Sequence, residues 1–122
     1  MKKKIAILGS TGSIGKTLFN ILLKEKKYAE IILLSAHKSH KILFKQAKAL
    51  KVKNLIITNK KDFDILKKKS KNTNIKVFND FDKLEKIFKK KIDYVMSSIS
   101  GIHGLEPTIK IIKFTKKIAI AN

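Results

Sequence analysis

Short runs of apolar residues alternate along the chain with longer stretches in which apolar residues recur every three or four positions. Unbroken apolar runs are typical of strands buried on both faces of a parallel sheet, and the wider spacing is typical of amphipathic helices. The sequence predicts strands at residues 4–8, 30–36, 54–58, 75–78, 92–97 and 117–121. It predicts helices at residues 16–23, 42–50, 62–69, 80–90 and 107–112. This alternation predicts an α/β fold, a doubly wound, Rossmann-like parallel sheet with helices on both faces.

The helix predicted at residues 80–90 has one apolar face that is expected to point inward. That face consists of Phe81, Leu84, Ile87 and Phe88. Asn79 or Asp80 is expected to cap the helix, because their side chains accept hydrogen bonds from free N–H groups at a helix N-terminus. The short strand before it, at residues 75–78, is expected near an edge of the sheet. Pro107, the only proline, fits the first turn of the last helix.

A glycine-rich segment, GSTGSIG at residues 9–15, joins the first predicted strand to the first predicted helix. Strand, glycine loop and helix in this order form the setting in which glycines bind a dinucleotide. Gly9 allows a sharp turn off the strand, and Gly12 leaves no side chain between the backbone and a pyrophosphate. Gly15 allows the helix to pack closely on the strand. The spacing G-x-x-G-x-x-G is not a P-loop, since no Gly-Lys-Ser/Thr closes it.

The N-terminus of the helix after this loop is expected to face the phosphates. Its free N–H groups and positive dipole end attract anions, and Thr11 and Ser13 add hydroxyl donors at the same place. The alternative interpretation is a tight turn between strand and helix that binds no ligand.

The length of 122 residues suits one domain, which at this size buries roughly two-thirds of its unfolded surface. The chain has no cysteine, which excludes disulfides and thiolate metal sites. No apolar run approaches the roughly 20 residues needed to span a bilayer. The apolar run after the lysine-rich N-terminus is too short for a signal peptide. The sequence therefore predicts a cytoplasmic protein with no membrane segment.

The chain is strongly basic, with a formal net charge of +20, and every one of its 29 basic residues is Lys. Such a charge often indicates a nucleic-acid partner. However, the chain lacks Arg, the usual reader of guanine and the preferred phosphate ligand, and its lysines are spread over the whole length. We therefore expect no nucleic-acid partner. The charge should still favour anionic ligands, NADPH included, by electrostatic steering.

The segment after the second predicted strand contains no carboxylate. In NAD-binding domains an Asp or Glu at this place binds the ribose 2′-OH. A carboxylate would repel a 2′-phosphate, whereas Lys38 and Ser39 offer a cation and a hydroxyl that bind one. The segment therefore favours NADPH over NADH; the alternative is that Lys38 is one more solvated lysine. His37 and His40 are expected near the adenosine end rather than in catalysis, and His103 is expected to be structural.

With these features the chain resembles the N-terminal domain of the 1-deoxy-D-xylulose 5-phosphate reductoisomerase family. The resemblance rests on residues 7–15, on residues 36–39, and on residues 98–108 followed by residues 117–122. The last combination is the most specific. The glycine loop alone would also fit aspartate-semialdehyde dehydrogenase or dihydrodipicolinate reductase. The resemblance covers essentially all 122 residues.

Two departures from the family pattern matter. The family often has Gly at the position of His37 and Asn at that of Ser39, although Ser39 keeps a hydrogen-bonding group. In the family a Lys-Glu pair follows the asparagine that Asn122 matches, and the metal-binding carboxylates and the substrate phosphate site come later still. Residues 1–122 are therefore expected to be an NADPH-binding domain truncated at its C-terminal end, without the catalytic and C-terminal domains.

The resemblance implies what the whole enzyme does. It would isomerise and reduce 1-deoxy-D-xylulose 5-phosphate, a phosphosugar, to 2-C-methyl-D-erythritol 4-phosphate in isoprenoid biosynthesis. The hydride would come from NADPH, and the missing catalytic domain would hold a divalent cation, Mg²⁺ or Mn²⁺. The family resemblance also suggests a homodimer.

The resemblance also implies which residues of this chain contact the cofactor, and it implies no catalytic or metal-binding residue among them. The pyrophosphate would lie at Thr11, Gly12, Ser13 and Ile14, the 2′-phosphate at Lys38 and Ser39 with His37 beside them, and the nicotinamide near Asn122. Two alternatives stay open. One is another NADPH-dependent dehydrogenase of this fold, such as an aspartate-semialdehyde dehydrogenase, which a downstream catalytic cysteine would reveal. The other is a non-catalytic nucleotide-binding or nucleic-acid-binding module.

Overall fold

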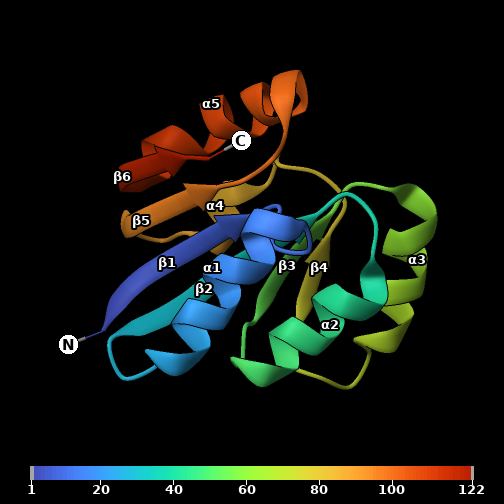
Figure 1. Ribbon diagram of the computed structural model, residues 1–122. Helices are drawn as coiled ribbons and strands as arrows, with labels where there is room; N and C mark the ends of the chain where they lie inside the picture. The colour runs from blue at the N-terminus through green and yellow to red at the C-terminus, as the bar shows by residue number, and fades with distance from the viewer. Residues whose placement is uncertain (1, 122) are drawn as a thin grey trace.

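The computed structural model describes residues 2–121 and contains one sheet of six strands. The strands are β1 (Lys3–Leu8), β2 (Ala29–Ala36), β3 (Asn54–Ile57), β4 (Lys76–Phe78), β5 (Ile92–Ser97) and β6 (Thr115–Ile120). Their spatial order is β4-β3-β2-β1-β5-β6, and every neighbouring pair is parallel (Figure 1). The predicted doubly wound parallel sheet is confirmed, and the short strand β4 lies at its edge as expected.

Helices follow the strands and cover both faces of the sheet. They are α1 (Ser13–Lys24), α2 (His40–Ala49), α3 (Lys60–Lys69), α4 (Leu84–Ile87) and α5 (Leu105–Ile111), with 3₁₀ turns η1 (Gly101–Gly104) and η2 (Ile112–Phe114). Helices α1, α2 and α3 pack on one face, and α4 and α5 pack on the other. Pro107 lies in the first turn of α5, as its missing N–H requires.

The core consists of two hydrophobic clusters separated by the sheet. Strand β1 contributes to both, because its side chains alternate: Ile5 and Ile7 join the first cluster, and Ala6 and Leu8 join the second. The first cluster also takes residues from the three helices on its face, Phe19, Leu22, Leu43, Ala47 and Leu66. The second takes Phe81, Leu84, Phe88 and Ile111. Each large apolar side chain buried in this way stabilises the fold by about 1.5–3 kcal/mol.

The connections change direction beside β1. From β1 the chain passes outward to β2, β3 and β4 on one side, and it then returns to place β5 and β6 on the other side. In open parallel sheets this topological switch point leaves a crevice at the carboxyl ends of the strands, and ligands bind there.

The helix predicted at residues 80–90 is much shorter in the structure. Only Leu84–Ile87 are helical, and Phe88 has extended backbone that ends the helix. Asp80 does not cap it: its Oδ1 accepts a hydrogen bond from the N–H of Asp82 at 3.0 Å, which holds the chain in a local turn instead. Lys83 stands at the N-cap position. The predicted inward face is confirmed for Phe81, Leu84 and Phe88, which are buried, while Ile87 is partly buried against them.

Helix α1 begins at Ser13 rather than at residue 16, so the helix starts inside the glycine-rich segment. Within residues 2–121, no helix combines the length and the apolar character needed to cross a membrane.

Candidate functional site

A cleft of about 600 Å³ lies at the carboxyl ends of β1, β2 and β5 and reaches the end of β3. It therefore opens at the switch point between β1 and β5. Backbone and small side chains form much of its wall; the lining residues are Gly9, Thr11, Gly12, Ser35, Ala36, His37, Thr58, Phe81, Ser98, Ile99, Ser100, His103 and Pro107. The lining contains two histidines and no lysine, aspartate or glutamate. The floor of the cleft is thus close to uncharged.

Hydrogen bonds from the neighbouring strands fix the start of the glycine loop. The N–H of Gly9 donates to the carbonyl oxygen of Ser35 at 3.0 Å and lies 3.2 Å from its Oγ. On the other side, the hydroxyl of Ser98 lies 3.0 Å from the carbonyl oxygens of both Leu8 and Gly9. Gly9 itself has a φ of +76°, which only glycine adopts easily. The turn predicted at Gly9 is confirmed, and serines from β2 and from the end of β5 hold it.

The other two glycines of the loop differ in what surrounds them. A Cβ added to Gly15 would lie 2.0 Å from the carbonyl oxygen of Gly9 and 2.6 Å from the Cα of Ser10, so α1 packs against the loop too closely for any side chain. A Cβ added to Gly12 would meet only the Gly9 carbonyl oxygen, at 3.8 Å. The structure therefore explains Gly15 by packing within the protein. It leaves open space at Gly12, on the cleft side of the loop.

The N-terminus of α1 is a suitable place for an anion. Gly12 stands at the N-cap position, so no side chain caps the first turn, and that turn contains no acidic residue. The first N–H groups of a helix have no partner within the helix, and together with the helix dipole they favour negative charge. Thr11 and Gly12 line the cleft at this point. Ser13 and Ile14 form the start of the helix and are exposed.

A buried pair of side chains ties the loop to α2. The hydroxyl of Ser10 donates to Oε1 of Gln46 at 2.8 Å, and Nε2 of Gln46 donates back to the carbonyl oxygen of Ser10 at 3.0 Å. Both residues are buried. A buried amide that satisfies its hydrogen bonds in this way fixes the position of its partner. The sequence signal for this contact was a glutamine at helical spacing among Leu43 and Ala47, on the inward face of α2.

The segment after β2 lies at the rim of the cleft. Nδ1 of His37 is 2.7 Å from the hydroxyl of Thr58, which follows β3. Lys38 and Ser39 are exposed, and Ser39 has a φ of +64° in the left-handed region. Asn adopts that region more readily than Ser. The structure therefore brings His37 into the cleft lining and places Lys38 and Ser39 beside it, outside that lining.

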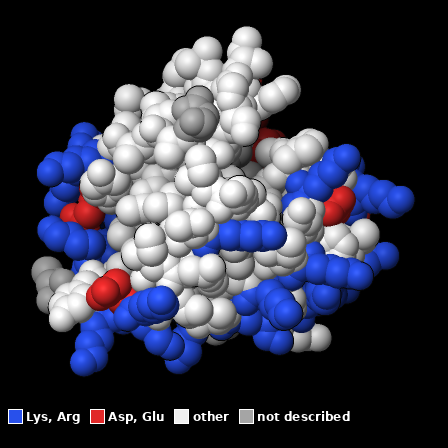
Figure 2. Space-filling view, in the orientation of Figure 1, with Lys and Arg blue, Asp and Glu red and all other residues white. Residues whose placement is uncertain are grey.

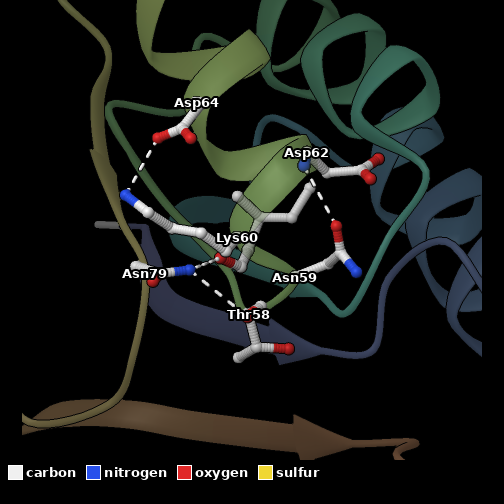
Figure 3. Close-up of polar contacts among 7 residues, drawn as sticks. Thr58, Asn59, Lys60, Asp62, Asp64 and Asn79 are labelled. Atoms are coloured by element: carbon white, nitrogen blue, oxygen red, sulfur yellow. Dashed lines mark hydrogen bonds and ion pairs between the residues drawn. The ribbon is translucent and has the colours of Figure 1, made fainter.

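Asn79 supports this rim from the end of β4. It does not cap a helix as predicted; instead its Nδ2 donates to the carbonyl oxygens of Ile57 at 2.9 Å and Thr58 at 3.3 Å (Figure 3). Asn59 performs the capping expected of such residues one element earlier, accepting from the N–H of Asp62 at the start of α3. Sequence reasoning missed Thr58 and Asn79, because nothing in the spacing of either residue showed that β3 and β4 end side by side at the cleft.

Two acidic residues near the cleft, Asp82 and Glu106, are paired with one lysine. Lys110 on α5 pairs with Asp82 and, at 2.8 Å, with Glu106. These hydrogen bonds, first to Asp82 and then to Glu106, raise the pKa of Lys110 above its ordinary value. On the face shown in Figure 2, lysines lie at both sides and over the lower half, while the upper part, over α5, is mostly uncharged. On this face the lysines do not line one concentrated basic groove.

No group of three or more His, Cys, Asp or Glu side chains capable of holding a metal ion together occurs in the part of the chain that the structure describes. Asn122, expected near the nicotinamide, lies outside the described residues.

The parallel sheet with its switch point, the glycine loop opening a helix and the cleft above them define a Rossmann-like domain of the dinucleotide-binding type. The 1-deoxy-D-xylulose 5-phosphate reductoisomerase family model matches residues 5–122, so the chain belongs to that family. The resemblance inferred from the sequence is confirmed, and the alternative families are not favoured.

Relatives agree with this assignment. The 1-deoxy-D-xylulose 5-phosphate reductoisomerase of Pelagibacter ubique (strain HTCC1062) is 55% identical over 122 residues, covering 98% of this chain and 31% of the relative. That of Wolbachia pipientis subsp. Culex pipiens (strain wPip) is 40% identical, with the same coverages. The solved structure of the Zymomonas mobilis enzyme in complex with NADPH has a TM-score of 0.88 and 26% identity, covering 100% of this chain and 32% of that one. The chain thus spans about a third of the length of the relatives it matches.

Proposed function

We propose that this chain is the NADPH-binding part of a 1-deoxy-D-xylulose 5-phosphate reductoisomerase, with residues 1–122 forming a cofactor domain truncated at its C-terminal end. One observation carries the proposal: the glycine loop opens α1 onto a cleft at the switch point, in a chain that matches the family over residues 5–122. The Zymomonas mobilis relative of the same fold was solved with NADPH.

The residues of the cleft fit the pyrophosphate of a dinucleotide. Backbone can approach a phosphate at Gly12, where even a Cβ would have room, and the uncapped N-terminus of α1 supplies N–H donors. Thr11, Gly12, Ser13 and Ile14 would hold the pyrophosphate there. The clamp formed by Ser35 and Ser98 keeps the loop in place before the cofactor arrives, so little ordering is required on binding.

The adenosine end would lie over the segment after β2. Lys38 and Ser39 are exposed there and would bind the 2′-phosphate, with His37 beside them. The absence of a carboxylate among residues 35–39 favours the phosphorylated cofactor. Asn122 would lie near the nicotinamide, from which bound NADPH supplies a hydride.

The remaining parts of the reaction belong to the longer protein. That protein would convert the phosphosugar 1-deoxy-D-xylulose 5-phosphate to 2-C-methyl-D-erythritol 4-phosphate, for isoprenoid biosynthesis. A divalent cation, Mg²⁺ or Mn²⁺, would be held by residues beyond this chain. A cytoplasmic homodimer without a nucleic-acid or membrane partner stays our prediction for the full-length protein.

The test uses the full-length protein that carries this chain. NADPH and NADH are titrated by nicotinamide fluorescence, and turnover of 1-deoxy-D-xylulose 5-phosphate is followed by NADPH absorbance with Mg²⁺ or Mn²⁺ added. We expect tighter binding of NADPH than of NADH, and oxidation of NADPH that depends on both substrate and metal. Binding of neither cofactor would overturn the proposal. Binding of NADPH with no turnover of this substrate would instead favour another dehydrogenase of the same fold.

A further inference from the structure

His37 occupies a special position at the rim of the cleft. It is the first residue after β2, the place from which Rossmann domains contact the ribose of the adenosine and the group attached to it. His37 lines the cleft, whereas Lys38 and Ser39 are not among its lining residues.

The structure holds the imidazole in a defined place. The backbone pairing of β2 and β3 continues past the strand ends. The N–H of Thr58 donates to the carbonyl oxygen of Ala36 at 3.1 Å, and the N–H of Asn59 donates to the carbonyl oxygen of His37 at 2.8 Å. This pairing sets His37 beside Thr58, whose hydroxyl is 2.7 Å from Nδ1. Asn79 in turn donates to the carbonyl oxygen of Thr58. With Nδ1 engaged, Nε2 is the ring nitrogen left for a ligand.

The contact to Thr58 can form with either the neutral or the protonated ring. A threonine hydroxyl either donates or accepts, so it bonds to neutral imidazole in one way and to imidazolium in another. In the imidazolium both nitrogens donate: Nδ1–H to Thr58, and Nε2–H to an anion. Histidine is the side chain that gains this second donor and a positive charge between about pH 5 and 8.

From this geometry we infer that His37 is a proton-dependent ligand of the cofactor 2′-phosphate, acting beside Lys38. The imidazolium strengthens binding of NADPH and leaves NADH, which lacks that phosphate, nearly unaffected. The preference for NADPH is therefore supported in mildly acidic solution by a group other than lysine. This inference rests on the proposed function.

Charged neighbours do not replace the phosphate as a partner for the ring. Lys38 follows His37 on the same loop, and His40 is the first residue of α2. Asp62 on α3 accepts the N–H of His40 at 3.3 Å, and His103 also lines the cleft. The hollow on the other side of Thr58 holds Asp80, Asp82, Glu106 and Lys110. Asp82 and Glu106 are paired with Lys110, and Asp80 accepts the N–H of Asp82. No ion pair joins His37 to a carboxylate among residues 2–121.

The experiment measures dissociation constants for NADPH and NADH with the full-length protein at about pH 8 and about pH 6, on the two sides of the ordinary histidine range. The ratio of the two constants reports the 2′-phosphate contact alone. The phosphate has a second pKa of about 6, so it loses charge as the pH falls. In His37→Gln the preference for NADPH should therefore decline toward pH 6. In the unmodified protein the preference for NADPH should stay constant or rise toward pH 6. At pH 6 its ratio of dissociation constants should exceed that of His37→Gln by roughly two- to fivefold, the effect expected of an exposed charge pair.

His103→Gln is the matched control, because it removes the other imidazole of the cleft and should keep the pH dependence of the unmodified protein. A pH dependence in His37→Gln that parallels the unmodified protein would overturn the inference while leaving the proposed function intact. Equal affinities for NADPH and NADH at both pH values would instead overturn the proposed function. If the pH dependence is lost in His103→Gln and kept in His37→Gln, it comes from His103, and our inference is wrong.

Discussion

Two substitutions in the glycine loop are predicted to have separate effects, one on folding and one on cofactor binding, although the two positions lie within about one turn of helix. Gly12 and Gly15 are three residues apart, and sequence reasoning gave each a different role. The structure supplies the distances that make the roles testable. We compare Gly12→Val with Gly15→Ala in the full-length protein.

The expected magnitudes follow from what an added side chain would meet. At Gly15 an added Cβ would lie 2.0 Å from the carbonyl oxygen of Gly9, which is backbone and cannot rotate away. Overpacking of this kind costs about 1–3 kcal/mol or more, and the better helix propensity of Ala returns only about 1 kcal/mol. Gly15→Ala should therefore destabilise the fold by about 2 kcal/mol.

Gly12→Val should leave the fold intact. The backbone at Gly12 is extended, with φ of −78° and ψ of 177°, which valine adopts without strain, and a Cβ there meets nothing closer than 3.8 Å. Loss of glycine at an N-cap position costs at most about 1 kcal/mol. The branched side chain would, however, stand where the pyrophosphate must approach. Loss of two charge-assisted hydrogen bonds, at about 1.5–3 kcal/mol each, would weaken NADPH binding by more than about a hundredfold.

The assays are thermal unfolding by circular dichroism and titration of NADPH by fluorescence. Gly15→Ala should lower the apparent melting temperature, and Gly12→Val should retain it while NADPH affinity collapses. Unchanged NADPH affinity in Gly12→Val would refute the assignment of the loop to the pyrophosphate. An unchanged melting temperature in Gly15→Ala would refute the packing argument.

Three further predictions follow from other parts of the chain. Lys38→Ala in the full-length protein should weaken NADPH binding by about one to two decades and leave NADH binding nearly unaffected, and the effect should shrink with added salt. The distant Lys89→Ala should change the binding of both cofactors little. Equal behaviour of the two variants would assign the preference for NADPH to the general charge of the protein. The isolated chain of residues 1–122 should show no reductoisomerase turnover with any divalent metal, and measurable turnover would show that the chemistry lies elsewhere than we infer. The N–H of Lys4, 2.8 Å from Asp93, and then Lys116 hold the pKa of Asp93 below its ordinary value of 3.8, so the stabilising contribution of this carboxylate is present above about pH 4 and is lost as the pH falls through the lowered pKa. Acid unfolding of Asp93→Asn should lack this component, and an acid midpoint identical to that of the unmodified protein would contradict it.

The fold was predictable because the central strands are long enough and apolar enough to show their burial. Ile5, Ala6, Ile7 and Leu8 are nearly or fully buried, with side chains on both faces of the sheet, so an unbroken apolar run was the correct signal for a central parallel strand. The spacing of the glycines likewise identified the position of the loop. Few residues other than glycine adopt the left-handed φ found at Gly9, and none with a side chain fits the close contact at Gly15.

The helix after β4 was not predictable to the same degree, because two local signals compete there. Apolar spacing at residues 81–88 indicates a helix, and it correctly identifies the inward face. Asp80 forms a hydrogen bond to the backbone two residues later, which Asp side chains do in turns as readily as at helix caps. Composition alone does not decide between these two uses of the same side chain. Tertiary packing of Phe81 decides it, by burying that side chain before the helix begins.

The polar supports of the site were missed for a different reason. Gln46 and Asn79 act on residues 36 and 21 positions away in sequence, through contacts that exist only once the sheet is assembled. A glutamine on an apolar helix face does indicate a buried polar contact from the sequence alone, because a buried amide requires a hydrogen-bond partner. The identity of the partner, Ser10, depends on the contact between α2 and the glycine loop in the folded protein.

The arrangement of charge in this molecule also constrains how it selects a cofactor. A net charge of +20 spread over the surface attracts NADH as well as NADPH, and salt screens it over about 8–10 Å at ordinary ionic strength. It can raise association rates, but it distinguishes poorly between two dinucleotides that differ in one phosphate. The cleft lining itself carries no lysine or carboxylate. If this chain binds NADPH as we propose, we expect discrimination to come from the few groups at the rim after β2, where Lys38 is exposed and His37 is held by Thr58. Raising the salt concentration should slow association of both cofactors alike, while the ratio of their affinities should change only as far as those rim contacts are exposed.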